Sequence, residues 1–162
     1  MKLNRDALLK AVGFRRWINL WPPLRSAGIR VTHASKDLRT IDVELRFTRF
    51  NRNYVGTHFG GSLFAMTDPF YMVMLHHALG SDYVCWDKAA SIRFRRPGLT
   101  TVTAHFHLTD ERLAEIRSAA DRDGTHDAVF NVDILDPAGE VICRVERTIY
   151  VATKAAHGAR GR

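Results

Sequence analysis

Residues 59–75, with the sequence FGGSLFAMTDPFYMVML, decide the fold of this chain. The segment opens on Gly60 and Gly61, and Asp68 is its one charged residue. From position 62 to position 79 the residues are apolar nearly all round, which predicts a central helix buried on every side. A carboxylate in such a stretch costs several kcal/mol unless something compensates or uses it. Asp68 is therefore the leading candidate for a functional residue.

Alternating apolar and polar residues on both sides of this helix predict antiparallel strands. Thr109 and Asp110 offer a good N-cap site for a short amphipathic helix through Ala120. The sequence Asp136-Pro137-Ala138-Gly139 is typical of the turn of a hairpin. One antiparallel sheet wrapped around one apolar helix is an α+β fold, and it explains why the helix is hydrophobic on every side. The predicted strands cover residues 41–48, 83–94, 101–108, 128–134 and 141–151.

The length of 162 residues suits one well-packed domain, and no linker divides the chain. We expect a single domain over residues 1–153, with an N-terminal helix within residues 1–20. Residues 154–162 read as a basic, mobile tail.

The net charge and the length of the apolar runs limit which classes of partner we expect. Lys and Arg number 24 against 17 Asp and Glu, which gives a formal net charge of +7. This excess could suit nucleic acid, an anionic membrane surface or a phosphate-rich ligand, but no recognition helix or zinc-finger spacing accompanies it, so we expect no nucleic-acid partner. Apolar runs stay short of the roughly twenty residues that span a bilayer. Without a signal peptide or an anchor, the expected location is the cytoplasm, with no membrane insertion.

The sequence contains two cysteines and a histidine pair that could suggest other chemistry. Cys85 and Cys143 stand in apolar contexts without a C-x-x-C spacing, so we expect buried thiols rather than a disulfide or a metal site. His105 and His107 share the polar face of a predicted strand without an evident third ligand. A solvated strand face is the better interpretation, and we predict no metal site.

The spacing of Asn53, the glycines and Asp68 resembles that of the hotdog-fold thioesterases of the phenylacetyl-CoA thioesterase type. Asn53 precedes Gly56, Gly60 and Gly61, and Asp68 lies seven residues beyond Gly61. The runs NRNYVGTHFGGSLFAMTDPF and DYVCWDKAASIRFRRPG resemble an uncharacterised branch of that superfamily. The resemblance covers residues 20–153. It implies a hotdog domain that assembles as a homodimer or a dimer of dimers, with sites between subunits.

The resemblance also implies an activity, the hydrolysis of an acyl-CoA or related thioester, with coenzyme A as part of the substrate and no separate cofactor. Asp68 would act as general base or as nucleophile. Backbone N–H groups of the turn formed by Gly60 and Gly61, which would face Asp68 from the partner subunit, would stabilise the oxyanion, with Gly61 the favoured donor. Asn53 of the partner subunit would hold the attacking water or the carbonyl; the alternative is that Asn53 caps its own loop.

Two features depart from the family pattern. Better-characterised relatives have a His immediately before the two glycines, where this chain has Phe59, and His58 lies one residue earlier. Pro69 predicts a kink within residues 65–69, whereas the alternative makes Asp68 an N-cap with Pro69 at the first helical position. The missing His supports a second function, a non-catalytic hotdog protein that binds acyl-CoA or another lipid-like ligand.

Further binding candidates surround this motif. His58 and Phe59 adjoin the glycines and could contact the substrate. Asp87 lies where relatives place a second polar group near the thioester, although Asp87-Lys88 is otherwise an ordinary solvated pair. Arginine side chains could bind the phosphates of coenzyme A or simply form an exposed basic strand end. These arginines are Arg93, Arg95 and Arg96.

Overall fold

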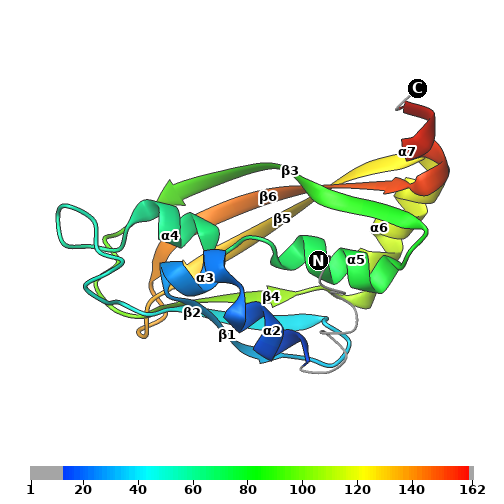
Figure 1. Ribbon diagram of the computed structural model, residues 1–162. Coiled ribbons are helices and arrows are strands. Elements are labelled where there is room, and N and C mark those ends of the chain that lie inside the picture. The colour runs from blue at the N-terminus through cyan, green and yellow to red at the C-terminus, as the bar shows by residue number, and fades with distance from the viewer. Residues whose placement is uncertain (1–12, 161–162) are drawn as a thin grey trace.

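A computed structural model describes residues 13–160 and shows one antiparallel sheet curved around two short helices (Figure 1). The strand order is β1-β2-β4-β5-β6-β3, with all neighbours antiparallel. This is the α+β arrangement that the alternating patterns predict. The strands are β1 (Ile29–Ala34), β2 (Thr40–Leu45), β3 (Tyr83–Phe94), β4 (Val102–His107), β5 (Thr125–Leu135) and β6 (Val141–Thr153).

The central helix is divided into α4 (Gly60–Ala65) and α5 (Phe70–Leu79), which corrects the prediction of one helix that is only kinked within residues 65–69. Pro69 has no N–H to donate and clashes with the preceding turn, so the helical ladder cannot pass through it. The end of α4 tightens before the break, because the N–H groups of Thr67 and Asp68 donate to carbonyls three residues earlier, at 3.1 Å each. The chain then restarts as α5.

The core lies between α5 and the concave face of the sheet (Figure 1). Phe70, Met74 and Leu75 of α5 are fully buried, and Phe70 packs against Phe106 of β4 with a centroid distance of 4.9 Å. Alternate residues of β5 and β6 complete the apolar face. This packing holds the start of α5, and with it the break, against the inner face of the sheet.

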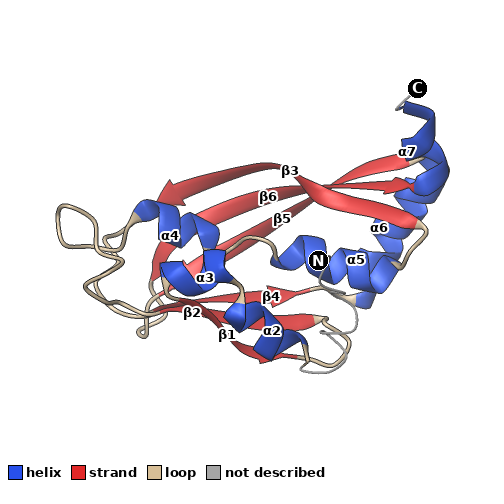
Figure 2. Ribbon diagram, in the orientation of Figure 1, coloured by secondary structure: helices blue, strands red, loops and turns tan. Residues whose placement is uncertain are grey.

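The remaining helices lie around the sheet (Figure 2). Helix α6 (Asp110–Asp123) begins at the predicted cap, where Thr109 Oγ1 accepts a hydrogen bond from the Arg112 N–H. Helices α2 (Phe14–Leu20) and α3 (Pro22–Ala27) precede β1; α3 and β1 are additional to the predicted elements. The part of the expected N-terminal helix before residue 13 lies outside the described residues. Residues 154–160, expected to be a mobile tail, form the short helix α7 (Lys154–Arg160).

The two outer strands of the sheet differ in what covers them. Asn19 of α2 donates from Nδ2 to the Val31 carbonyl and accepts the Val31 N–H at Oδ1, at 2.9 and 2.7 Å. These bonds occupy part of the outer edge of β1. Strand β3, at the other side, pairs with β6 alone among the described residues and is exposed along most of its length after Tyr83. None of the helices within residues 13–160 has both the length and the apolar character needed to cross a membrane.

Candidate functional site

Asp68 lies in the linker between α4 and α5, at the break in the central helix. Its side chain is 53% exposed, and its peptide bond to Pro69 is cis. Neither predicted alternative describes it fully. The helix is broken rather than kinked, and Pro69 rather than Asp68 occupies the N-cap position of α5, without a side-chain capping bond. The carboxylate is thus free of a capping role and open to solvent.

Beneath this carboxylate lies Arg147 of β6, whose side chain is only 4% exposed. Its Nη2 forms an ion pair with Asp68 Oδ2 at 3.3 Å. The same Nη2 donates to Asp87 Oδ1 at 2.6 Å, and Nε donates to that oxygen at 3.2 Å. The ring of Phe64 on α4 lies 5.5 Å from the guanidinium carbon. One buried cation therefore joins the helix break to the edge strand β3.

Arg147 is not among the site residues predicted from the sequence, although a signal for it exists. Its neighbours two residues away along β6, Val145 and Ile149, are buried, so the alternation turns Arg147 toward the core. A charge at a position that the pattern buries is the same signal that marks Asp68.

Asp87 reaches Arg147 because β3 has a bulge at this point. Asp87 pairs with Ile149 and Ala89 pairs with Thr148, so β3 has one extra residue, Lys88, between two consecutive pairs of the ladder with β6. Asp87 is directed to the inner face, while Lys88 forms an ion pair with Asp127 at 2.5 Å. Asp87 and Lys88 are therefore not a solvated pair with each other, and Asp87 belongs to the cluster around Asp68.

Gly60 and Gly61 form the first turn of α4, as predicted, but neither has a positive φ. Aromatic rings explain them instead. A Cβ on Gly61 would lie 2.4 Å from Cε1 of Phe59, and one on Gly60 would lie 3.0 Å from Cζ of Phe94. Both rings belong to exposed residues, so exposed aromatic side chains lie beside the two glycines at the start of the helix.

Asn53 is engaged within its own loop. Its Oδ1 accepts the N–H groups of Val55 and Thr57 at 3.1 and 3.0 Å. Its Nδ2 donates to Thr57 Oγ1 at 2.7 Å and to the His58 carbonyl at 3.2 Å. These four bonds support the loop-capping alternative over contact with a substrate.

His58 is turned into the protein, whereas Phe59 is exposed. The His58 ring packs edge-on against Phe47 at a centroid distance of 4.9 Å, and its Nε2 lies 2.8 Å from the Thr100 carbonyl oxygen. Burial lowers the pKa of His58, because the charged imidazolium is poorly solvated there. Of these two substrate-binding candidates, the one with a ring at the surface is Phe59.

The three arginines near the end of β3 are all exposed. Arg96 forms an ion pair with Glu140 at 2.6 Å, and the backbone N–H groups of Arg95 and Arg96 both donate to the Ile142 carbonyl. Arg93 lies within β3 itself, opposite Arg144 of β6. The arginines thus form a basic strand end at the protein surface, where a phosphate group could reach them.

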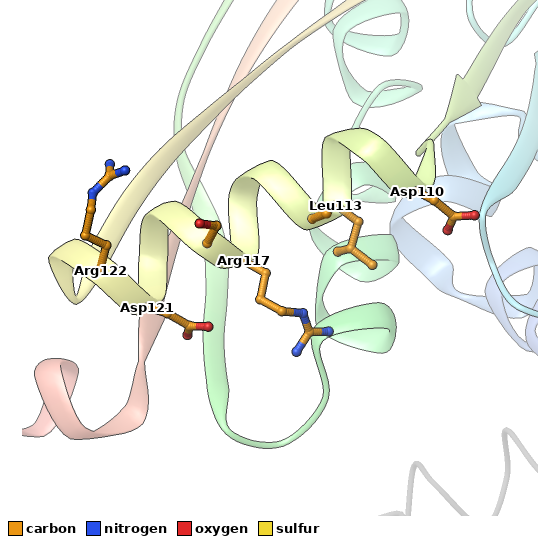
Figure 3. A pocket seen from close by; sticks show the side chains of 7 residues that line it. Asp110, Leu113, Arg117, Asp121 and Arg122 are labelled. Atoms are coloured by element: carbon orange, nitrogen blue, oxygen red, sulfur yellow. The ribbon is translucent and has the colours of Figure 1, made fainter.

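Two hollows occur elsewhere on the molecule. One, of about 670 Å³, runs along α6, where Arg117 and Asp121 point to the same side (Figure 3). The other, of about 400 Å³, lies over β2, β4 and β5 and includes His105. Neither hollow is lined by a residue of the Asp68 cluster, so we place the candidate site by its charged groups rather than by the size of a cavity.

Within residues 13–160 no group of three metal-binding side chains is suitably placed for an ion. His105 Nδ1 lies 2.5 Å from Asp42 Oδ1, and His107 Nδ1 lies 3.1 Å from Thr40 Oγ1. Each histidine therefore has a polar neighbour on the strand β2 beside it. Both cysteines are free thiols, as predicted, but only Cys143 is fully buried, because Cys85 lies on the edge strand β3 and is partly exposed.

Comparisons with known proteins identify the fold and a family. The model of a family described as Domain of unknown function (DUF4442) matches residues 11–151. No protein of curated function matches the sequence. Among solved structures, a Pseudomonas aeruginosa protein described as a probable thioesterase superposes with a TM-score of 0.75 at 18% identity, covering 86% of this chain and 93% of that one.

A second solved structure, a thioesterase from Haemophilus influenzae, gives a TM-score of 0.62 at 14% identity and covers 85% of this chain and 87% of its own. At such identities the likeness shows the fold alone. The predicted hotdog fold is confirmed by these neighbours.

Proposed function

The chain belongs to the DUF4442 family. We propose that it hydrolyses an acyl-CoA or a related thioester, because it belongs to this family, shares the fold of thioesterases and exposes the Asp68 carboxylate. The observation that carries the proposal is the position of Asp68. Its carboxylate is 53% exposed at a break in an otherwise buried helix, with a buried cation beneath it. Such a placement leaves the carboxylate free to meet a substrate.

Two routes use Asp68. As a general base, its carboxylate takes a proton from a water molecule whose oxygen attacks the thioester carbonyl carbon; the C–S bond then breaks and the thiol leaves with that proton. As a nucleophile, a carboxylate oxygen bonds to the carbonyl carbon and expels the thiolate, and water then hydrolyses the resulting anhydride. Both routes return Asp68 to its starting state.

The first turn of α4 supplies hydrogen-bond donors in this proposal. The initial N–H groups of a helix have no acceptor within the helix, and Gly60 and Gly61 occupy these positions. In this proposal the Gly61 N–H donates a hydrogen bond to the thioester carbonyl oxygen as negative charge develops on that oxygen. Phe59 and Phe94, whose rings lie beside the glycines, would contact the acyl group or the pantetheine arm.

Asn53 and His58 have no part in this reaction. The Asn53 side chain holds the loop that leads to α4, and His58 anchors that loop to Thr100. For Arg93, Arg95 and Arg96 we propose contact with the phosphate groups of coenzyme A. Their exposure at one strand end and the affinity of guanidinium for phosphate oxygens support this assignment.

We also propose that the protein assembles as a homodimer, or as a dimer of dimers, through β3. The two sheet edges differ, because Asn19 bonds to the edge of β1 while β3 has no neighbour beyond it among the described residues. An uncovered edge strand invites pairing with another strand. Pairing along β3 would bring the second copy beside Asp87 and Phe94. Light scattering on the purified protein should give at least twice the monomer mass of 18.4 kDa, and a monomer mass would contradict the proposal.

Turnover of a panel of acyl-CoA esters by the wild type and by Asp68→Asn tests the function. Release of free thiol should be detected with at least one ester and should fall by at least about 100-fold in the variant, the lower part of the usual contribution of a positioned base. Asp133→Asn is the matched control, since Asp133 also faces an arginine, Arg144, at 3.2 Å but on the exposed side of the sheet. Equal rates in wild type and Asp68→Asn would refute the proposal.

The second candidate function is binding of an acyl-CoA or lipid-like ligand without turnover. The position of His58 favours it, because the only histidine next to the glycine turn is buried against Phe47 and cannot assist a reaction. Calorimetry separates the two functions. Tight binding of a CoA ester that remains intact after prolonged incubation would favour the binding protein.

A further inference from the structure

Arg147 is a buried charge that the stability of the sheet does not explain. Taking a guanidinium out of water is expensive, and replacing a buried ion pair by apolar residues of similar volume is often neutral or stabilising. The adjoining positions of the inner face of β6, Val145 and Ile149, carry such apolar residues. An aliphatic side chain would therefore suit position 147 of the sheet, and the arginine points to another role.

The bonds of Arg147 are divided unequally between its two carboxylates. Asp87 accepts two N–H groups at a single oxygen, Oδ1, at 2.6 and 3.2 Å, and is 27% exposed. Asp68 receives one ion pair at 3.3 Å and is 53% exposed. Asp87 thus fixes the guanidinium, while Asp68 keeps a longer and more accessible contact with it.

The bulge in β3 makes this arrangement possible. It puts Asp87, which pairs with the buried Ile149, on the same face of the sheet as Arg147, although Ala90 is the residue of β3 that pairs directly with Arg147. β-Bulges commonly redirect a side chain next to a functional site.

Asp68 needs an external restraint because its backbone is not in a helix. Residues 66–69 lie outside both α4 and α5, so no helical ladder sets the direction of the Asp68 side chain. Within the described residues, the charged group that forms an ion pair with its carboxylate is Arg147. The direction of the carboxylate therefore depends on this contact.

We propose that Arg147, held by Asp87 at the β3 bulge, is a positioning residue that holds the carboxylate of residue 68 in the orientation required for attack on the thioester. The inference rests on the proposed function of Asp68 and adds two residues to its site. Arg147 does not contact the substrate in this proposal; it acts through the Asp68 carboxylate, whose Oδ2 it contacts. Misplacement of a reacting group by about 1 Å can cost about 100-fold in rate.

The first test is kinetic. Arg147→Lys keeps the charge but loses the fork that binds Asp87, and Asp87→Asn keeps the shape but loses the anion. Both variants should lower kcat by roughly 10- to 100-fold with KM within about 2-fold of the wild type. The control is Arg144→Lys, which alters an arginine of the same strand that is paired with Asp133 on the exposed face; its kcat should not change. Wild-type kcat in Arg147→Lys and Asp87→Asn would overturn the proposal.

The second test does not depend on turnover and uses ¹³C-labelled formate as the probe. Asp68→Ala removes the carboxylate and leaves its place above Arg147 open, so formate should bind there and broaden or shift its NMR signal. In Asp68→Ala/Arg147→Lys the affinity for formate should fall by at least about 5-fold, a coupling of about 1 kcal/mol at RT of about 0.59 kcal/mol. Circular dichroism confirms that both variants are folded.

The two tests separate failure of this inference from failure of the proposed function. If the wild type hydrolyses no ester but formate binding depends on Arg147, the thioesterase proposal fails and the carboxylate-holding role stands. If Asp68→Asn is inactive but formate binds both Ala variants equally, or binds neither, the thioesterase proposal stands and the role of Arg147 is refuted.

Discussion

Asp87 and Asp68 share one guanidinium, and we predict that their removal has very different effects on stability. In Asp87→Ala, the Arg147 side chain, which is only 4% exposed, loses the acceptor of both of its short bonds. In Asp68→Ala it loses one ion pair of 3.3 Å to a carboxylate that is more than half exposed. The first change leaves a buried charge almost without a partner, and the second does not.

The magnitudes follow from these exposures. Removing one partner of a buried ion pair costs about 3–5 kcal/mol, and because Asp87 retains some exposure we expect the lower end, about 3 kcal/mol, for Asp87→Ala. Exposed pairs contribute about 0–1 kcal/mol, so Asp68→Ala should cost less than about 1 kcal/mol. For a chain of this length each kcal/mol shifts the melting temperature by about 2–4 °C, which separates the two variants by roughly 4–8 °C.

Urea denaturation followed by circular dichroism measures both variants against the wild type. The slopes of the transitions should agree, so that the midpoints alone report the change in free energy of unfolding. Asp133→Ala, from the exposed pair with Arg144, should behave like Asp68→Ala. If Asp68→Ala destabilises the protein as much as Asp87→Ala, Asp68 has a structural role and the division of labour around Arg147 is wrong.

Three further predictions concern groups away from this cluster. Because burial lowers the pKa of His58, the unfolded chain binds more protons than the folded one just below pH 6.5, and the free energy of unfolding should fall as pH drops through that window. The fall should be less steep in His58→Gln, and identical pH profiles of the two proteins would contradict the burial argument. Gly98→Ala would place a Cβ 2.9 Å from Cδ2 of His58 and should destabilise by about 1–3 kcal/mol in urea titrations; an unchanged midpoint would show that the loop yields freely. Desolvation raises the pKa of the Cys85 and Cys143 thiols to about 11, so iodoacetamide at pH 8 should modify both slowly in the native protein and faster in the unfolded protein. Rapid loss of two thiols from the native state would contradict these raised pKa values.

The architecture could be predicted because its signals are local and periodic. The alternation of residues 128–134 and the cap at Thr109 each specify an element whose residues need no distant partner to be recognised. The break at Pro69 is different. Proline predicts a disturbance there, but whether a helix bends or stops depends on how its two halves pack against the sheet, as Phe70 does against Phe106.

The candidate site could be predicted only in part. Asp68 stands out because its neighbours in sequence are apolar, whereas the partners of Asp68 come from strands β3 and β6, far along the chain. The bulge that directs Asp87 inward adds one residue to a strand register that no sequence pattern reveals. Asn53 shows the converse. Its spacing matches a catalytic family, but its hydrogen bonds, visible only in the folded loop, are all local.

The exposed carboxylate at the helix break is the centre of this account, and the kcat of Asp68→Asn on the best acyl-CoA ester tests it most directly. We predict that kcat falls by at least about 100-fold while the fraction of folded protein and the melting temperature stay close to those of the wild type. A folded Asp68→Asn protein that hydrolyses the ester at the wild-type rate would contradict the account.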